Sequence, residues 1–266
     1  MSDTMNYSFL DEMAGQGFEG MTAGDFPVPF IKLLTNGSPE TMEGGKSYIE
    51  GAKPGMFLNT STRELYKNLD VIPVKYEPMW TEWKPNRGDF VARHAPNSIP
   101  VIGDPYTGMK TKEGNDVVDN MVYYVLIVGQ LKKGIHVISL RGSGIRHGKN
   151  WNRMIADLCL PKDPSKPESA SNPYGTKATG KPCPFFGGVW RLSLHFNENS
   201  EGAWWTLGVG KETKIEFVRY ISKEDYDEYV GKERKALDNK QPMLAIESLK
   251  DDSEDLRDVT ANEKDF

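Results

Sequence analysis

Aromatic side chains alternate with cationic ones in three stretches of this sequence, a combination suited to binding unpaired nucleic-acid bases. The stretches lie at 75–94, 141–153 and 181–191. Unpaired bases stack on planar side chains while Lys and Arg follow the phosphates, and this geometry does not depend on base sequence. The residues expected to contact DNA are Lys75, Tyr76, Trp80, Trp83, Lys84, Arg87, Phe90, Arg93, Arg141, Arg146, Lys149, Arg153, Trp190 and Arg191.

The competing interpretation is that these aromatic residues form the core, because Trp and Phe on strands are usually buried. In a regular strand Trp80 and Trp83 face opposite sides of the sheet, so one of them should be exposed. The neighbours Trp204 and Trp205 should also face opposite sides. Trp151 falls on the apolar face of an expected helix and is assigned to the core.

Charge is distributed unevenly around the formal net value of −5. Residues 247–266 contain eight acidic and three basic residues and account for a charge of −5, whereas 132–191 carries +8. A basic middle segment beside an acidic end is typical of a polyanion-binding protein, because Lys and Arg displace counterions from phosphates.

Signatures of catalysis and of metal binding are absent or weak. The sequence contains no Gly-x-x-x-x-Gly-Lys-Ser/Thr loop, and the Gly-Ser-Gly at 142–144 lacks the spacing of a nucleophile elbow. Cys159 and Cys183 are 24 positions apart and the four His are scattered, so neither a zinc site nor a cofactor is expected and the two thiols should be free. The sequence predicts a protein that is not an enzyme.

No apolar run approaches the roughly 18–20 residues that a membrane-spanning helix needs. The first residues include acidic side chains where a secretory signal has basic ones. We therefore expect no membrane partner and a cytoplasmic location.

The elements that must position these residues are mostly short strands. Strand patterns cover 55–60, 69–78, 79–83, 89–94, 188–197 and 203–210, and 117–130 with 132–143 reads as a hairpin. One helix is expected at 149–158 with Asn150 as its N-cap, and a polar helix at 223–237 that starts at Ser222 and Asp225. The order predicts a mainly β fold, a small OB-fold-like barrel with elaborated loops and a helix after the central hairpin.

Four regions follow from this pattern. Residues 1–25 form a flexible arm, 26–221 the OB-fold-like domain, 222–246 a peripheral helix and linker, and 247–266 a disordered acidic tail. A Pro-rich loop occupies 161–184 within the domain.

The acidic tail ends in Asp265-Phe266, which suits docking of a ring and a carboxylate into a basic, apolar pocket of a partner. The same segment can compete with DNA for the chain's own basic surface. The tail residues expected to bind partners are Asp251, Asp252, Glu254, Asp255, Asp258, Asp265 and Phe266.

The tail, the run GAKPGMFLNTSTRELYKNLDVIPVKYEPMWTEWKP at 51–85 and the helix start with Lys149, Trp151 and Asn152 together resemble bacteriophage single-stranded DNA-binding proteins. That family combines an OB-fold with an acidic tail that ends in Phe. The resemblance implies a role in DNA replication and recombination in the infected host. It also implies contacts of the tail with a polymerase, a primase-helicase or host transcription proteins. The absence of a zinc motif separates the chain from zinc-bearing phage binders.

Three alternatives remain open from the sequence. The chain could anneal complementary strands as a recombination mediator, or it could be a phage protein that binds host replication or transcription machinery without DNA. A nuclease is the third. The sequence is also compatible with a homodimer.

Overall fold

The computed structural model describes residues 28–86, 88–104, 108–161, 178–200 and 202–239. The expected N-terminal arm, most of the Pro-rich loop and the acidic tail lie outside these described residues. Strands account for 44% of the residues that the structure describes and helical residues for 20%. The prediction of a mainly β fold with few helices is therefore confirmed.

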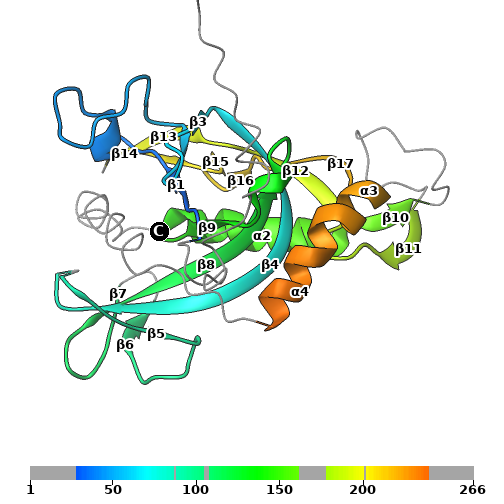
Figure 1. Cartoon of the computed structure of the whole chain (residues 1–266). Helices are drawn as coiled ribbons and strands as arrows, with labels where there is room; N and C mark the ends of the chain where they lie inside the picture. Colours follow the sequence, from blue (N-terminus) through cyan, green and yellow to red (C-terminus); the bar gives the residue numbers. More distant parts are fainter. Residues whose placement is uncertain (1–27, 87, 105–107, 162–177, 201, 240–266) are drawn as a thin grey trace, which may run out of the picture.

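The centre of the fold is a long antiparallel pair formed by β4 (Asn68–Trp83) and β8 (Asp116–Ile127), which curves through the whole molecule (Figure 1). At one end the pair is flanked by β12 (Gly188–Ser193) on β4 and by β9 (His136–Leu140) on β8. β17 (Glu216–Tyr220) continues the sheet beyond β12. The predicted central hairpin is thus present as β8 and β9.

At its other end the β4–β8 pair is flanked by β5 (Phe90–His94) and β7 (Gly108–Lys110), and β6 (Ile102–Asp104) pairs with β7. The resulting strand order is β17-β12-β4-β8-β7-β6, with β5 and β9 off this path. Among the described strands β9 and β17 do not pair, so the sheet does not close into a barrel.

Two prolines, Pro73 and Pro78, lie inside β4, which joins the adjoining extended runs predicted at 69–78 and 79–83. Both are tolerated because β4 has only one partner there. Between Ile72 and Met79 it pairs with β8, and no described strand pairs with its other side. A proline N–H is therefore not required on that edge, and a register shift after Pro73 adjusts the ladder.

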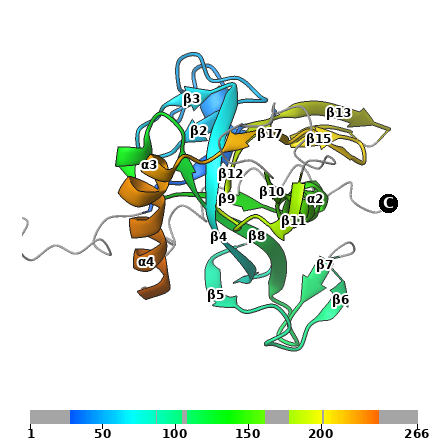
Figure 2. The same ribbon diagram turned by 90° about the vertical axis from the view of Figure 1, so that its right-hand side faces the viewer.

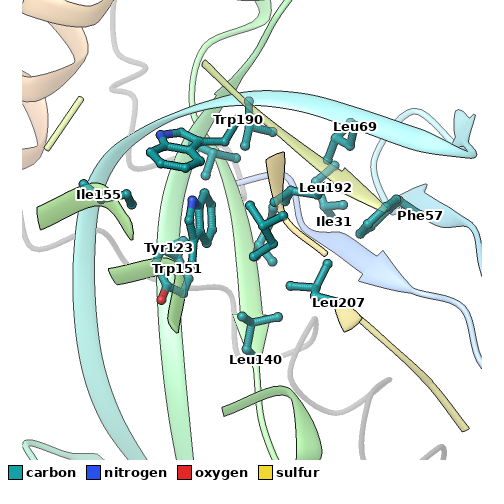
Figure 3. Packing of buried hydrophobic residues seen from close by; sticks show 14 of the residues in the cluster. Ile31, Phe57, Leu69, Tyr123, Leu140, Trp151, Ile155, Trp190, Leu192 and Leu207 are labelled. Atoms are coloured by element: carbon teal, nitrogen blue, oxygen red, sulfur yellow. The ribbon is translucent and has the colours of Figure 1, made fainter. Parts of the chain in front are cut away.

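Side chains on the two faces of this sheet pack into separate clusters. On one face Met121, Tyr123 and Val125 belong to the same cluster as Trp151 and Trp190. Figure 3 shows Tyr123, Trp151 and Trp190 in this cluster. The Tyr123 and Trp151 rings stack with their centroids 4.5 Å apart. On the opposite face Val122, Tyr124 and Leu126 of β8 pack with residues of the C-terminal helix. The central strands are therefore covered on both faces.

Helix α2 (Ser143–Asp157) follows β9 as predicted, but it starts six residues earlier than the sequence pattern indicated. Gly144 and Gly148 lie within it and lower the helix propensity of its first turns. The sequence pattern therefore did not predict those turns as helical. Gly148 allows close packing of α2 on β8, since a Cβ there would lie 2.7 Å from the Met121 sulfur and that side chain would have to shift. Asn150 is not the N-cap, and its amide donates to Thr213 at 2.9 Å.

The C-terminal helical segment consists of α3 (Lys223–Asp225), a π-helical turn η4 (Tyr226–Val230) and α4 (Gly231–Asn239). The Ser222 hydroxyl accepts the backbone N–H of Asp225 at 3.0 Å, which confirms the predicted start. α4 packs against β4 (Figure 1).

Smaller sheets surround this core. One joins β1 (Ile31–Leu33), β2 (Phe57–Asn59) and β3 (Leu65–Tyr66). The others are the pairs β10 (Cys159–Pro161) with β11 (Ala178–Pro182), β13 (His195–Asn199) with β14 (Gly202–Thr206), and β15 (Gly208–Val209) with β16 (Glu212–Thr213). Two 3-10 turns, η2 (Pro39–Thr41) and η3 (Leu131–Lys133), complete the described elements. None of the helices within these described ranges combines the length and the apolar character needed to span a membrane.

Candidate nucleic-acid interface

Helix α2 carries a stripe of three exposed cations, Arg146, Lys149 and Arg153. Residues three and four positions apart lie on the same side of a helix, so these three share one face. The opposite face holds Trp151 and Ile155, which are buried against the sheet. Figure 2 shows α2 below β13 and β15 and above β6 and β7. The buried face thus fixes the orientation of the cationic stripe toward solvent.

Two carboxylates moderate the charge of the stripe. Arg153 lies 3.5 Å from Asp157, but both side chains are largely exposed, and such pairs contribute little. Asp119 of β8 is half-buried, and burial raises its pKa while the charge of Lys149 lowers it. Lys149 is therefore close to the Asp119 carboxylate. The more exposed positive charge of the stripe comes from Arg146 and Arg153.

Tyr76 of β4 is a partly accessible ring beside this stripe. Its ring centroid lies 5.2 Å from that of Tyr123, whose hydroxyl donates to Oδ1 of Asn152 on α2 at 2.9 Å. Burial, and to a smaller extent the charge of Asp119, raise the pKa of Tyr76. Of the residues expected to contact DNA, the structure therefore brings together Tyr76 and the three cations of α2.

The hairpins that follow β12 pack beside α2. Thr213 of β16 lies 3.1 Å from Nδ1 of His147 on α2 and also accepts the Asn150 amide, while β14 contacts the same helix. These contacts hold the surface of the hairpins and the cationic stripe in a fixed relation.

Phe196 on β13 is an exposed aromatic residue that the sequence analysis missed. It is 46% exposed and packs edge-on against Trp205 of β14, with the ring centroids 5.5 Å apart. Trp205 is held in place because its ring covers Gly55 and its Nε1 donates to Asn36. The sequence did offer a signal for this residue. The alternation in His195-Phe196-Asn197 predicts a strand, and in the hairpin Phe196 pairs with Trp205.

Trp80, Trp83 and Trp190 are buried and present no accessible ring on which a base could stack. Their exposed fractions are 7%, 2% and 0%. Trp80 and Trp83 do face opposite sides, but each side is covered. Trp80 packs against the β7–β8 turn region, and Trp83 packs edge-on against Phe90 and donates to Thr81. An elaborated loop therefore buries the face that a simple strand would expose.

The expected cations of β4 and β5 are not assembled with the α2 stripe. Lys75 pairs in register with Tyr124 and lies over its ring, on the face opposite Tyr123. Arg93 stands beside Phe90, and burial lowers its pKa. Lys84 is exposed and forms an ion pair with Asp89 at 3.0 Å.

Two further expected residues flank the core. Arg141 is half-buried immediately before α2. Arg191 forms two hydrogen bonds with Asp70, of 2.7 and 2.8 Å, from Nε and Nη2. Because both carboxylate oxygens are engaged in a fork-to-fork pair, Arg191 has less capacity to bind a phosphate than the exposed cations of α2.

The substitution Arg191→Gln is accordingly expected to change the affinity for single-stranded DNA by less than about twofold, since partnered charges contribute little to counterion release. Fluorescence anisotropy with a labelled oligo-dT strand measures the effect, with Lys149→Gln as the comparison. A loss for Arg191→Gln as large as that for Lys149→Gln would contradict this assignment.

Some expected residues cannot be placed. Arg87 and all of the tail residues lie outside the described part of the chain. The tail residues in question are Asp251, Asp252, Glu254, Asp255, Asp258, Asp265 and Phe266.

A family model for Pam3 phage gp34-like proteins matches residues 2–234, most of the chain. The chain belongs to this family. The match indicates a phage protein, which confirms the phage part of the resemblance drawn from the sequence. Comparisons of this Pam3 phage gp34-like protein with curated proteins and with solved structures gave no match.

Proposed function

We propose that this protein binds single-stranded DNA without catalysis and largely without base specificity, in phage DNA replication and recombination. The observation that carries the proposal is the row of Arg146, Lys149 and Arg153 along the exposed face of α2. Tyr76 and Phe196 add partly exposed rings near the same helix and on the adjoining hairpin. Cations that follow phosphates and rings that stack on bases are the two requirements for binding unpaired strands.

The strand order supports this proposal by its similarity to an OB-fold. In chain order β4, β8 and β9 are followed by α2 and then by β12 and β17, and the spatial order is β17-β12-β4-β8-β9. An OB-fold is a partly open five-stranded barrel that binds oligonucleotides with its second and third strands and with the loops after its first and fourth strands. Here those loops correspond to 84–115 and 194–215. Phe196 lies in the second of them.

The acidic tail completes the proposal. Its net charge of −5 complements the cations of α2, so the tail would compete with DNA when no partner holds it. Replication, recombination or host transcription proteins would release the DNA surface by binding the tail. This role rests on charge and on the resemblance noted above.

The test is the affinity of the full-length protein for labelled oligo-dT between about 50 and 200 mM salt, a range over which phosphate contacts weaken strongly. We expect binding that falls with salt and that exceeds binding to a duplex of equal length. Anisotropy is preferable to tryptophan quenching, because four of the six tryptophans are buried.

A variant with the tail carboxylates replaced by amides should bind more tightly at low salt than the natural sequence. If neither protein binds oligo-dT at low salt, the proposed function is wrong.

A further inference from the structure

A hollow of about 340 Å³ opens along the edge of β4, away from the exposed cations of α2. Val74 and Leu237 supply apolar lining, and both belong to the cluster on the outer face of the sheet. The rings of Tyr76 and Phe185 also line it. This volume is at the lower end of the roughly 300–1,000 Å³ of small-molecule sites, so it suits one small flat group and not a whole segment of polymer.

Two cations and one carboxylate stand around the hollow. Lys75 and Arg234 line it together with Asp238. The Arg234 guanidinium is held 4.3 Å from the Phe186 ring centroid, and Lys75 lies over Tyr124. Asp238 reduces the positive charge without cancelling it. The lining therefore offers apolar and aromatic surface for a ring, next to positive charge for an anion.

The bordering edge of β4 is a poor template for an added peptide strand. It has no partner among the described strands between Ile72 and Met79, but it contains Pro73 and Pro78 and a register shift after Pro73. Prolines and irregularities on an edge strand prevent regular pairing. The chemistry of the hollow thus favours a ligand that inserts a ring over one that extends the sheet.

We propose that the hollow is a subsite for one unpaired nucleotide of the bound strand, with the base against Phe185 and Tyr76 and its phosphate near Arg234 and Lys75. This assignment rests on the proposed function. Tyr76 connects the two surfaces, because it lines the hollow and its ring packs against Tyr123, whose hydroxyl donates to Asn152 on the helix that carries the cationic stripe. A strand bound along α2 would continue around the β4 edge, past Tyr76, to place one nucleotide in the hollow.

The experiment compares Phe185→Leu and Arg234→Gln in the full-length protein. Leucine retains apolar volume and removes the stacking ring. Phe217→Leu is the matched control, since Phe217 is half-buried against the same core cluster as Phe185 but does not line the hollow. Lys232→Gln is the control for Arg234→Gln, because Lys232 is an exposed cation on the same helix. Urea midpoints establish that each variant is folded.

Affinity is measured for oligo-dT and for a strand of equal length with abasic positions, which retains the phosphates. Loss of one stacking contact should weaken oligo-dT binding by about fivefold or more. We expect Phe185→Leu to show this loss for oligo-dT and little change for the abasic strand, and Arg234→Gln to weaken both. The two controls should match the natural sequence.

The outcomes separate this subsite from the proposed function. If the natural sequence binds oligo-dT and folded Phe185→Leu binds equally well, the subsite is wrong and the DNA-binding function stands. A loss in Arg234→Gln alone overturns base insertion as well, because only a charge contact would then remain. If the natural sequence does not bind, both proposals fail.

Discussion

Replacing Arg146, Lys149 and Arg153 together with glutamine is expected to lower the affinity for single-stranded DNA by about 100-fold near 0.1 M salt. Each lost phosphate contact removes about 0.7 from the slope of log affinity against log salt for single strands. The slope should therefore become less steep by about 2. Glutamine is a good helix former, and the three side chains are exposed, so α2 should remain folded.

The matched control replaces Lys46, Lys53 and Lys67 with glutamine. These lysines are exposed on the part of the chain that contains β1, β2 and β3, and the net charge changes by the same amount. Equal losses in the two triple variants would indicate a general charge effect. No loss in the α2 variant would remove the observation on which the proposed function depends.

The substitution Trp151→Ala is expected to reduce the free energy of unfolding by about 3–5 kcal/mol, the usual cost of truncating a buried Trp. Trp151 is fully buried and stacks on Tyr123, so the change removes the main contact between α2 and the sheet. The total free energy of unfolding of a typical domain is about 5–15 kcal/mol. Urea unfolding followed by circular dichroism measures the loss.

Trp151→Phe should cost much less. The buried indole Nε1 finds no acceptor among the described residues, and removing an unsatisfied buried donor returns part of its desolvation cost. Trp204→Ala is the control, because Trp204 is only half-buried on a hairpin. If Trp151→Ala unfolds at the same urea concentration as the natural sequence, the packing of α2 on β8 is wrong.

The fold class was predictable because strand alternation and hairpin turns are local signals. The β8–β9 hairpin and the helix after it follow from such patterns. The start of α2 was not predictable, because Gly144 and Gly148 lower local helix propensity and the close packing of Gly148 against Met121 of β8 is not visible in the local sequence. The residues of β4 were predicted as extended at 69–78 and 79–83. Pro73 and Pro78 are acceptable inside this one strand because no described strand pairs with that edge.

The candidate site was predictable in its charges and not in its aromatic residues. Lys149 and Arg153 are spaced as neighbours on the predicted helix, whereas Arg146 joins their face only because α2 begins at Ser143. Whether a Trp on a strand is covered depends on elements far along the chain, and the covering of Trp80 by Met109 leaves no local trace. Arg234 was missed because the hollow forms only when α4 packs beside β4.

The one-sided pairing of β4 also affects how the protein can be made. β4 emerges from the ribosome more than a hundred residues before β12 and α4, so its edge is uncovered while the rest of the chain is synthesised. Uncovered strand edges join those of neighbouring chains and lead to aggregation. Pro73 and Pro78 lie along the stretch of β4 edge that no described strand pairs with in the folded protein. They would protect nascent chains from one another until the later elements arrive.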